Sequence, residues 1–284
     1  MEQSHESPSR TQPLPDREFR RLAEFIYAEC GIKLPPTKKT MLEARLHKRL
    51  RTLNMESYST YCDYLFSPKG QEAELISLID TVTTNTTEFF REPKHFEILT
   101  QKVIPNFIER FGINTTLRLW SAGCSSGEEP YTLAVVLSEA MRLTPGFRFG
   151  ILATDISTQV LKRAMNATYP IEKVQCVPME QKKRYMLRGK NHCQGLVRFS
   201  PEIRSYIEFQ RLNFMEEFSF DKLKHVIFCR NVIIYFDRKT QENLLGRFCN
   251  CLEPGGHLFI GHSESITGMD LPLTPVAPTV YRRT

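Results

Sequence analysis

Residues 117–131, LRLWSAGCSSGEEPY, decide the fold of the larger part of this 284-residue chain. Leu117–Ser121 is strand-like, Gly123 and Gly127 mark the turn that follows, and a helical pattern begins near Tyr131. A glycine turn between a strand and a helix lets a ligand approach the backbone closely. Because an ordinary tight turn can have the same glycine spacing, the stretch predicts a strand–turn–helix unit and a candidate ligand site.

The residues of this turn narrow the class of ligand that it could hold. The turn has neither the G-x-G-x-x-G pattern of dinucleotide-binding folds nor the Gly-Lys-Ser/Thr of a P-loop. Glu128 and Glu129 stand at the expected helix start, where they would repel a pyrophosphate. Two carboxylates would instead suit a cationic ligand that carries hydroxyls and an ammonium group. The charge therefore favours S-adenosylmethionine over a dinucleotide.

Strand-like and helical runs alternate along the chain on both sides of this turn. The strand-like runs are residues 116–121, 147–154, 207–212, 226–228 and 257–260, and the helical runs between them include residues 131–141, 160–165 and 238–251. This alternation predicts a doubly wound α/β domain, a parallel sheet with helices on both faces. Ligands of such sheets bind beyond the carboxyl ends of the strands, where the strand order reverses.

Polar residues follow the expected strands at that edge. Asp155 ends the second strand, where it could accept hydrogen bonds from ribose hydroxyls. An aspartate in this place is often a helix cap, but Ser157 could cap instead. Asn213–Phe214 and Arg230–Val232 end the next two strands, and the former places an amide and an aromatic ring where an adenine would lie. Each position is weak evidence alone, but together they favour a cofactor site.

The chain before about Pro93 has a different pattern, with helical periodicity and little glycine. A first helix is expected from Asp16, with a capping-type start, to a stop at Gly31. Further helices are expected at residues 37–53, 58–65 and 71–82. We therefore expect a disordered leader at residues 1–15, an all-helical domain at residues 16–93 and the α/β domain at residues 94–284.

One stretch interrupts the alternation. Between residues 186 and 206 three short runs are separated by Gly189, Gly195 and Pro201. Runs of this length with turn residues between them predict a small antiparallel β insert.

Composition bounds the setting of the protein. Apolar residues make up 41% and charged residues 25%, as in ordinary soluble proteins, and there is no apolar run of membrane-spanning length. The start of the chain has no hydrophobic signal core. The eight cysteines include no C-x-x-C pair, which argues for a reducing cytoplasm, and the seven histidines make no metal-spaced set. The net charge of +6 suggests an acidic partner of unspecified class.

Four segments together resemble the chemotaxis receptor glutamate methyltransferases of the CheR type. They are TTNTTEFFRE at 83–92, WSAGCSSGEEPY at 120–131, FCRNVIIYFD at 228–237 and GHSE at 261–264. The similarity extends from Asp16 to Tyr281 and implies a helical domain joined to a doubly wound methyltransferase domain with a three-stranded insert. It implies an S-adenosylmethionine-dependent O-methyltransferase that forms glutamate methyl esters on the cytoplasmic domains of chemoreceptors, with S-adenosylhomocysteine as the second product.

The resemblance also implies roles for individual residues. The implied cofactor contacts are Asn85, Thr87, Arg91, Glu129, Asp155, Asn213, Phe214, Asn231 and Val232. A glutamate carboxylate is ionised at pH 7, so its methylation needs no general base. Arg91 could orient that carboxylate by a charge-assisted hydrogen bond, and Tyr235 could donate a second one. A buried core aromatic is the alternative for Tyr235, and a simple turn is favoured over chemistry for His262-Ser263-Glu264.

Two surfaces could recognise a receptor. Seven Lys or Arg stand between Lys33 and Arg51 against one acid, Glu43; in this stretch Arg45, Lys48 and Arg49 lie largely opposite a leucine stripe and could dock on an acidic receptor helix. A solvated helix face would give the same pattern. In tethering members of the resembled family the β insert pairs with a C-terminal receptor pentapeptide. The residues of this chain that match are Arg188, Gly189, Gly195 and Arg198. We expect a cytoplasmic monomer that is recruited to membrane receptor arrays without insertion into the bilayer.

Two other functions stay open. A nucleic-acid methyltransferase would share the core and the basic charge, but such amino-methylating enzymes usually carry Asp/Asn-Pro-Pro-Tyr/Phe where this chain has Asn231-Val-Ile-Ile-Tyr-Phe. No stripe of interleaved aromatic and basic residues is present for stacking bases. A non-catalytic module that senses S-adenosylmethionine is the second alternative hypothesis.

Overall fold

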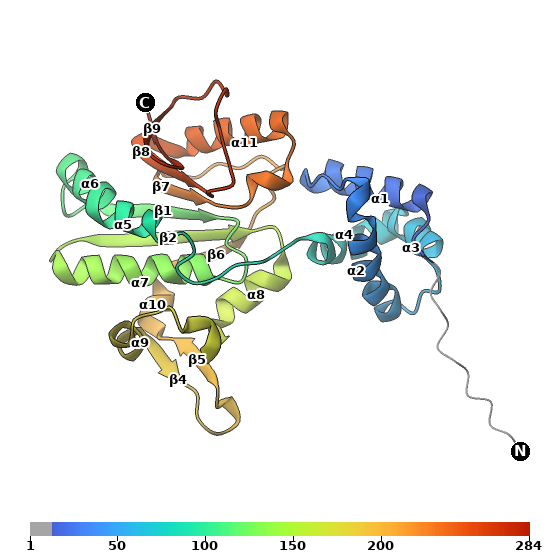
Figure 1. Cartoon of the computed structure of the whole chain (residues 1–284), viewed down its shortest axis with the longest axis horizontal. Helices are drawn as coiled ribbons and strands as arrows, with labels where there is room; N and C mark the ends of the chain where they lie inside the picture. Colours follow the sequence, from blue (N-terminus) through green and yellow to red (C-terminus); the bar gives the residue numbers. More distant parts are fainter. Residues whose placement is uncertain (1–12) are drawn as a thin grey trace, which may run out of the picture. The chain divides into compact units, whose positions relative to one another are not determined.

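The structure is a computed structural model that describes residues 13–284. Two compact units are present, the first ending at Thr83 and the second spanning Thr84–Thr284 (Figure 1). The expected leader falls outside the described residues over positions 1–12, but Pro13–Pro15 belong to the fold. Leu14 is fully buried and its backbone N–H donates to Glu43 at 3.1 Å, which corrects the expected start of the first domain.

The first unit consists of helices, as predicted. They are α1 Asp16–Cys30, α2 Lys39–Thr52, α3 Tyr58–Leu65 and α4 Pro68–Val82, with a 3-10 turn η1 Pro36–Lys38. Gly31 ends α1 in the left-handed conformation (φ 71°), as expected. The expected cap at Asp16 is wrong: Pro15 holds the N-cap position without a side-chain cap, and Asp16 is already helical, with its carboxylate accepting from Lys39.

The second unit is built on a seven-stranded sheet of order β6-β2-β1-β7-β8-β10-β9. Its parallel strands are β1 Thr116–Ala122, β2 Arg148–Asp155, β6 Ile207–Arg211, β7 Lys224–Cys229 and β8 Leu252–Ile260. The strands that follow β1 first extend the sheet to one side, and β7 then returns to the other side of β1. The strand order therefore reverses between β1 and β7, which is where ligands of doubly wound sheets bind.

Two antiparallel strands at the sheet edge were not predicted. They are β9 Leu273–Ala277 and β10 Val280–Arg283, and β10 pairs with β8. Prolines interrupt the alternation of residues in this part of the sequence, at Pro272, Pro275 and Pro278. Proline is tolerated in an edge strand such as β9, where no partner needs its missing N–H.

Helices cover both faces of the sheet, with α11 on one side and α7 and α8 on the other (Figure 1). The helices of this unit are α5 Lys94–Ile98, α6 Ile104–Phe111, α7 Glu128–Leu143, α8 Thr158–Asn166, α9 Met179–Tyr185, α10 Pro201–Ser205 and α11 Arg238–Cys251. The π-helical segment η2 Leu99–Val103 joins α5 to α6, and η3 Ile171–Val174, η4 Asn191–Cys193 and η5 Ile233–Tyr235 are short 3-10 turns. Along β1, Leu117 and Leu119 join one core cluster and Trp120 and Ala122 join the other. Two layers of core thus hold a rigid sheet.

The small antiparallel sheet exists, but its boundaries differ from those expected. Its order is β3-β5-β4, with β3 Thr168–Pro170, β4 Met186–Arg188 and β5 Leu196–Phe199. The third expected run, near Ile203, is instead helix α10, because Ser200 caps it and Pro201 is its first residue. The third strand lies earlier in the chain, immediately after α8.

The boundary between the two units also differs from the expected one at residue 93. Residues 84–93 belong to the second unit because polar contacts bind them there. Ser125 Oγ donates to the Asn85 carbonyl at 3.0 Å, and the Phe90 N–H donates to Thr132 Oγ1 at 3.2 Å. Among residues 13–284, no helix is both long and apolar enough to cross a membrane.

Candidate functional site

The β1–α7 turn lies at the carboxyl ends of the parallel strands. Gly123 and Gly127 both have left-handed φ values, 86° and 98°, which explains why glycine stands at each position. The N–H groups of Gly123 and Cys124 both donate to the Thr154 carbonyl at 2.8 Å, which ties the turn to β2. A Cβ atom on Gly123 would lie 2.4 Å from Val232 Cγ2, so the turn also packs closely on the loop after β7.

Asp155 joins the turns after β1 and β2. Its Oδ2 accepts from the Ser125 N–H at 2.8 Å and its Oδ1 accepts from the Ser157 N–H at 2.9 Å. Ser157 caps α8 by accepting from the Val160 N–H, as expected. Asp155 is therefore not the cap of α8, but its carboxylate already fixes two loops of the site.

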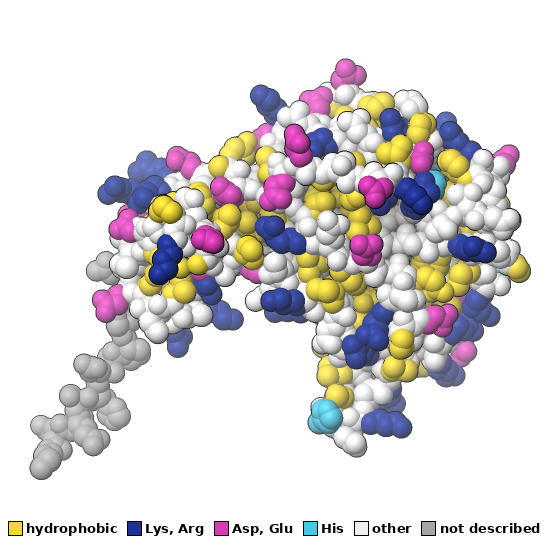
Figure 2. All heavy atoms as spheres, turned by 180° about the vertical axis from the view of Figure 1, so that it is seen from behind, with side chains coloured by type: hydrophobic (Ala, Val, Ile, Leu, Met, Phe, Trp, Pro, Cys, Tyr) yellow, Lys and Arg dark blue, Asp and Glu magenta, His cyan; other side chains and the backbone are white. Residues whose placement is uncertain are grey.

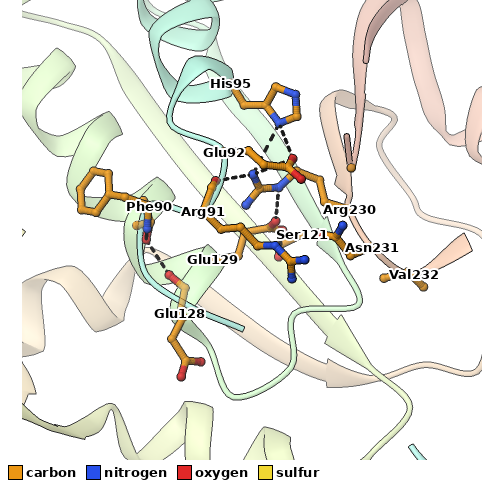
Figure 3. Close-up of polar contacts among 12 residues, drawn as sticks. Phe90, Arg91, Glu92, His95, Ser121, Glu128, Glu129, Arg230, Asn231 and Val232 are labelled. Carbon is orange, nitrogen blue, oxygen red and sulfur yellow. Dashed lines mark hydrogen bonds and ion pairs between the residues drawn. The ribbon is translucent and has the colours of Figure 1, made fainter. Parts of the chain in front are cut away.

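Glu129 is held in a buried ion pair. Its Oε1 accepts from Ser121 Oγ and its Oε2 from Arg230 Nε, both at 2.7 Å (Figure 3). The neighbouring Glu128 is also buried and accepts from Lys173 at 2.8 Å. Each carboxylate thus has a cationic partner, so the charge argument from the sequence is weaker than the two glutamates alone suggested.

Arg230 connects this ion pair to the segment that precedes α5. One of its terminal nitrogens (Nη1) donates to the Arg91 carbonyl at 2.6 Å and lies 3.5 Å from the Glu92 carboxylate (Figure 3). Its guanidinium lies over the rings of Phe96 and Phe228, at 5.4 and 5.6 Å. The sequence analysis placed Arg230 at the end of a strand but gave it no role, and its ion pair with Glu129 was not predicted.

The backbone on either side of Arg91 is strained. Phe90 and Glu92 have φ values of 55° and 56°, a left-handed conformation that costs roughly 1–2 kcal/mol for each residue with a side chain. The contacts of Thr132 with Phe90 and of Arg230 with Arg91 hold this conformation. The Arg91 side chain is half-buried, its Nη1 lies 3.4 Å from the Thr86 carbonyl, and Figure 3 shows it extending on the side of Glu129 and Asn231.

Glu264 anchors the loop after β7. Its buried carboxylate accepts from the N–H groups of Asn231, Val232 and Ile233 at 2.8–2.9 Å, and also from that of Gly261. Asn231 needs this support because its φ is 59°. Burial raises the pKa of the Glu264 carboxyl, and the donating backbone groups oppose that rise. The interpretation of 262–264 as a turn without chemistry missed this positioning role, which the GHSE segment could have signalled.

The predicted residues after β6 are placed less simply. Asn213 Oδ1 accepts from the Met215 N–H at 3.0 Å, and its amide nitrogen lies 3.3 Å from Glu216. Phe214 packs in an aromatic cluster, 5.4 Å from Phe248 and 6.2 Å from Trp120 between ring centroids. The ring of Phe214 therefore belongs to the core, and any role toward an adenine stays a prediction.

Tyr235 and Thr87 complete the predicted set. Tyr235 ends η5, its side chain is half-buried, and its hydroxyl lies 3.5 Å from the Thr84 carbonyl. The hydroxyl thus reaches the segment that carries Asn85, Thr87 and Arg91. The alternative of a fully buried core aromatic does not fit this exposure.

Three possible metal ligands meet near Arg230. Glu92, His95 and His262 place one ligand atom each within 4.8 Å of one another. The spacing in the sequence could not reveal this group because His262 is distant along the chain. Arg230 Nη1 lies 3.5 Å from Glu92 and 3.4 Å from His95 Nδ1, so a guanidinium already supplies positive charge there. Burial, then Arg230, lowers the pKa of His95 to about 4.

Two family models match this chain, one over each of its two units. Residues 17–83 match the family model of the CheR methyltransferase all-alpha domain, and residues 85–281 match that of its SAM binding domain. The chain belongs to the CheR methyltransferase family. It is a methyltransferase whose cofactor is S-adenosylmethionine.

Curated relatives agree with this assignment. A chemotaxis protein methyltransferase of Borreliella burgdorferi is 40% identical over 271 residues, which cover 94% of both chains. One of Salmonella typhimurium is 38% identical over 269 residues, which cover 94% of this chain and 90% of the relative. One of Escherichia coli is 38% identical over 269 residues and 91% of its length.

The residues at the strand ends of this CheR methyltransferase fit the cofactor chemically. The side chains there are carboxylates and amides, Asp155, Asn213 and Asn231, a set suited to hydroxyl and ammonium groups more than to phosphate. Gly123 leaves no room for a Cβ and keeps the turn backbone close to Val232. The donor set and the glycine turn therefore support the predicted cofactor contacts without showing them.

The predicted receptor-facing residues of α2 differ in their surroundings. Arg45 donates to the carbonyls of Val82 and Thr83 at the end of α4, at 2.6 and 3.1 Å. Arg49 forms a two-bond ion pair with the buried Glu74. Lys48 is exposed. Arg45 and Arg49 therefore hold the helical unit together, a role that the helical wheel did not reveal.

The predicted residues of the insert surround β4, one edge strand of the small sheet. In the register Arg188 faces Val197 and Leu187 faces Arg198, so the two arginines belong to opposite faces. Both are exposed, and Arg198 Nε donates to the Asn166 carbonyl at 3.0 Å. Gly189 closes tightly on η4, since a Cβ there would lie 2.0 Å from the Cys193 carbonyl, and Gly195 has φ 86°.

Proposed function

We propose that this chain methylates glutamate side chains on the cytoplasmic domains of chemoreceptors, as part of adaptation in bacterial chemotaxis. The supporting observation is the match of both units, the helical one and the α/β one, to the two domains of the CheR family. The relatives named above are chemotaxis protein methyltransferases along nearly their whole length.

The chain's residues would act by position and charge. When bound, S-adenosylmethionine would supply the methyl group on its sulfonium sulfur, with S-adenosylhomocysteine as the second product. The accepting carboxylate is ionised at pH 7, so no residue needs to remove a proton. Arg91 would orient this carboxylate by a charge-assisted hydrogen bond, and Tyr235 would donate a second one. Strain on both sides of Arg91, held by Arg230, fits a residue that must keep one position.

The cofactor would be held at the strand ends. The proposed contacts are Asn85, Thr87, Arg91, Glu129, Asp155, Asn213, Phe214, Asn231 and Val232. The turn at Gly123 and the two loops anchored by Asp155 and Glu264 bring these segments together.

The role of Arg91 is tested by a single substitution. Arg91→Ala should reduce methyl-ester formation by about a hundredfold, because a charge-assisted contact made to the acceptor is lost. The affinity for S-adenosylhomocysteine, measured by calorimetry, should fall much less. Arg142→Ala, an exposed arginine of α7, is the matched control. Unchanged turnover in Arg91→Ala would remove Arg91 from the mechanism.

The acceptor is tested with radiolabelled S-adenosylmethionine. Base-labile label on receptor-containing membranes supports glutamate esters. Stable label on RNA or DNA would support a nucleic-acid methyltransferase, and no label would support a sensing module. On the face drawn in Figure 2, Lys and Arg lie scattered among Asp and Glu over both units, which does not favour a continuous nucleic-acid track.

We further propose that the exposed face of α2 docks on an acidic receptor helix, chiefly through Lys48. Lys48→Glu should raise the Michaelis constant for receptor a few-fold at low salt and less at high salt. Arg45 and Arg49 are unsuitable tests because their loss would also weaken the helical unit. A Michaelis constant that ignores both the substitution and the salt would contradict docking by this face.

A receptor tail peptide could pair with β4. The edge position of β4 favours an added strand, with Arg188 or Arg198, according to the face, meeting a carboxylate of the peptide. Gly189 and Gly195 shape the adjoining loop. Titration of a receptor-tail pentapeptide against wild type and Arg188→Ala tests this proposal, and an absence of binding to wild type would contradict it.

We further propose that the enzyme is a cytoplasmic monomer that is recruited to receptor arrays.

A further inference from the structure

A half-open cavity of about 540 Å³ lies at the amino ends of β1 and β7. Helix α6, the starts of β1 and β7, the bulge at Gly255–Gly256 in β8 and the β9–β10 hairpin line it. Leu117, the second residue of β1, lies in its wall, whereas Ala122 ends the same strand beside the cofactor turn. The cavity is thus at the end of the sheet opposite the methyltransferase site.

The charges in the wall are mostly positive. Arg110, Arg282 and Arg283 line the cavity with Thr284, the last residue of the sequence, and Glu109 is the one acidic side chain in the lining. None of the three guanidiniums forms an ion pair with a carboxylate of residues 13–284. This differs from the methyltransferase end, where Arg230 is paired with Glu129.

Arg283 carries a donor that lacks an acceptor. One terminal nitrogen donates to the Leu252 carbonyl, but its Nε is buried and has no hydrogen-bond partner. Because Nε has no accessible surface, a bound phosphate would be contacted by the terminal nitrogens of Arg283 and not by Nε.

The rest of the wall is apolar and suited to a flat ring. Phe107 and Phe111 line the cavity beside His225, with ring centroids 4.7 and 4.9 Å from the imidazole. Arg110 lies over the Phe111 ring and reaches the place where a Cβ of Gly255 would stand, so glycine makes room for the guanidinium. Burial lowers the pKa of His225 to about 4, so this histidine is neutral at pH 7 and adds no charge.

We propose that this cavity binds a small organic phosphate of about nucleotide size, with its phosphate on Arg282, Arg283 and Arg110 and its ring against Phe107 and Phe111. The volume lies within the range of small-molecule sites and exceeds what an inorganic ion fills. Guanidinium groups match phosphate oxygens in geometry as well as charge.

Calorimetry on the full chain with guanosine monophosphate tests the proposal. Saturating S-adenosylhomocysteine is present, so that the cofactor site is blocked. Guanosine monophosphate should bind saturably, and guanosine and inorganic phosphate should each bind about tenfold more weakly or worse, since each lacks half of the contacts. Uridine monophosphate serves as a second probe. No saturable binding of either nucleotide up to about 10 mM overturns the proposal.

Substitutions locate the binding. Arg282→Ala should weaken guanosine monophosphate about tenfold or more, because one charge-assisted contact is removed. Arg282 is exposed, so its loss leaves the fold intact. The affinity of Arg283→Ala for guanosine monophosphate is a second test. Arg163→Ala, an exposed arginine of α8, is the matched control. Equal affinities in wild type and Arg282→Ala would overturn the assignment, and S-adenosylhomocysteine affinity and methyl transfer should be unchanged in both.

Discussion

The two ends of the seven-stranded sheet differ in how their charged side chains are paired. At the carboxyl ends, Glu129 is paired with Arg230 and Glu264 accepts four backbone N–H groups. At the amino ends, Arg110, Arg282 and Arg283 face a cavity without a carboxylate partner among the described residues. One end therefore uses its charges to hold backbone in place. The other has one ion pair, Arg118–Glu253, and three guanidiniums without a carboxylate partner among the described residues.

This difference separates positioning from binding. The carboxylates after β1, at the end of β2 and after β8 bind neighbouring loops, among them the loop that carries the left-handed Asn231. Such a closed network fixes a site within a small tolerance before ligand arrives. The guanidiniums without a carboxylate partner hold little of the backbone in place, so a bound anion could form charge-assisted hydrogen bonds with them.

Breaking the closed network should have the largest effect. Arg230→Met would leave Glu129 as a buried unpaired carboxylate and release the Arg91 carbonyl, so we expect a loss of about 3–5 kcal/mol in the free energy of unfolding and of nearly all methyl transfer. Arg282→Met at the amino ends of the strands should cost less than about 0.5 kcal/mol. Urea denaturation measures both. Equal losses would mean that the two ends do not differ in this way.

Acid should weaken both ends through buried neutral histidines. Burial chiefly lowers the pKa of His95 at one end, and of His225 and His257 at the other, to about 4. Because the unfolded pKa is about 6.5, the unfolded chain takes up protons first as the pH falls. The stability is therefore fully present above about pH 6.5 and is lost between there and pH 4, on the order of 3 kcal/mol for each histidine.

Melting temperatures measured from pH 7.5 to pH 5 check this expectation. His225→Gln should flatten the fall below pH 6.5, since one titrating group is gone, while His192→Gln in the exposed η4 turn should not. A wild-type curve that stays level to pH 5 would contradict the neutral state of these histidines.

Neutralising the anchor of the β7 loop should have a smaller effect. Glu264→Gln keeps the shape but points an amide N–H₂ at a backbone N–H, which should cost about 1–3 kcal/mol. The Asn231–Ile233 loop would then move, so the affinity for S-adenosylhomocysteine should fall about tenfold. Glu253→Gln at the amino end, where the partner is the half-buried Arg118, is the control and should leave that affinity unchanged. Calorimetry that finds equal affinities for wild type and Glu264→Gln would exclude the anchoring role.

Much of the fold could be predicted from local patterns. The four helices of the first unit and the strands β1, β2, β6, β7 and β8 each carry their own periodicity, and strand ends of a doubly wound sheet meet by topology. Asp155 and Asn231 could be selected in this way. The β9–β10 hairpin could not, because prolines hide its alternation, and the third strand of the small sheet lies outside the stretch where turn residues gather.

Contacts between distant residues escaped prediction. Glu129 and Arg230 are far apart in sequence, as are Glu92 and His262. No local sequence pattern predicts that either pair is in contact. Arg45 and Arg49 were selected by charge, yet their partners are carbonyls of α4 and the buried Glu74. Charge shows that a side chain needs a partner, but only the packed structure shows whether the chain already supplies one.

The smallest expected effect concerns the contact between the β1–α7 turn and the loop after β7. Gly123 and Gly268 both have positive φ values, 86° and 77°, but a Cβ on Gly123 would lie 2.4 Å from Val232, whereas the nearest atom to a Cβ on Gly268 would be Arg238 Nη2 at 3.8 Å. Both alanine variants should lose about 1 kcal/mol to backbone strain. Gly123→Ala should lose about 1 kcal/mol more and also methyl-transfer activity, because it pushes the Asn231–Val232 loop outward. Urea denaturation and turnover of the two variants separate these contributions. If both variants kept full activity, the contact between the β1 turn and the β7 loop would not set the geometry of the site.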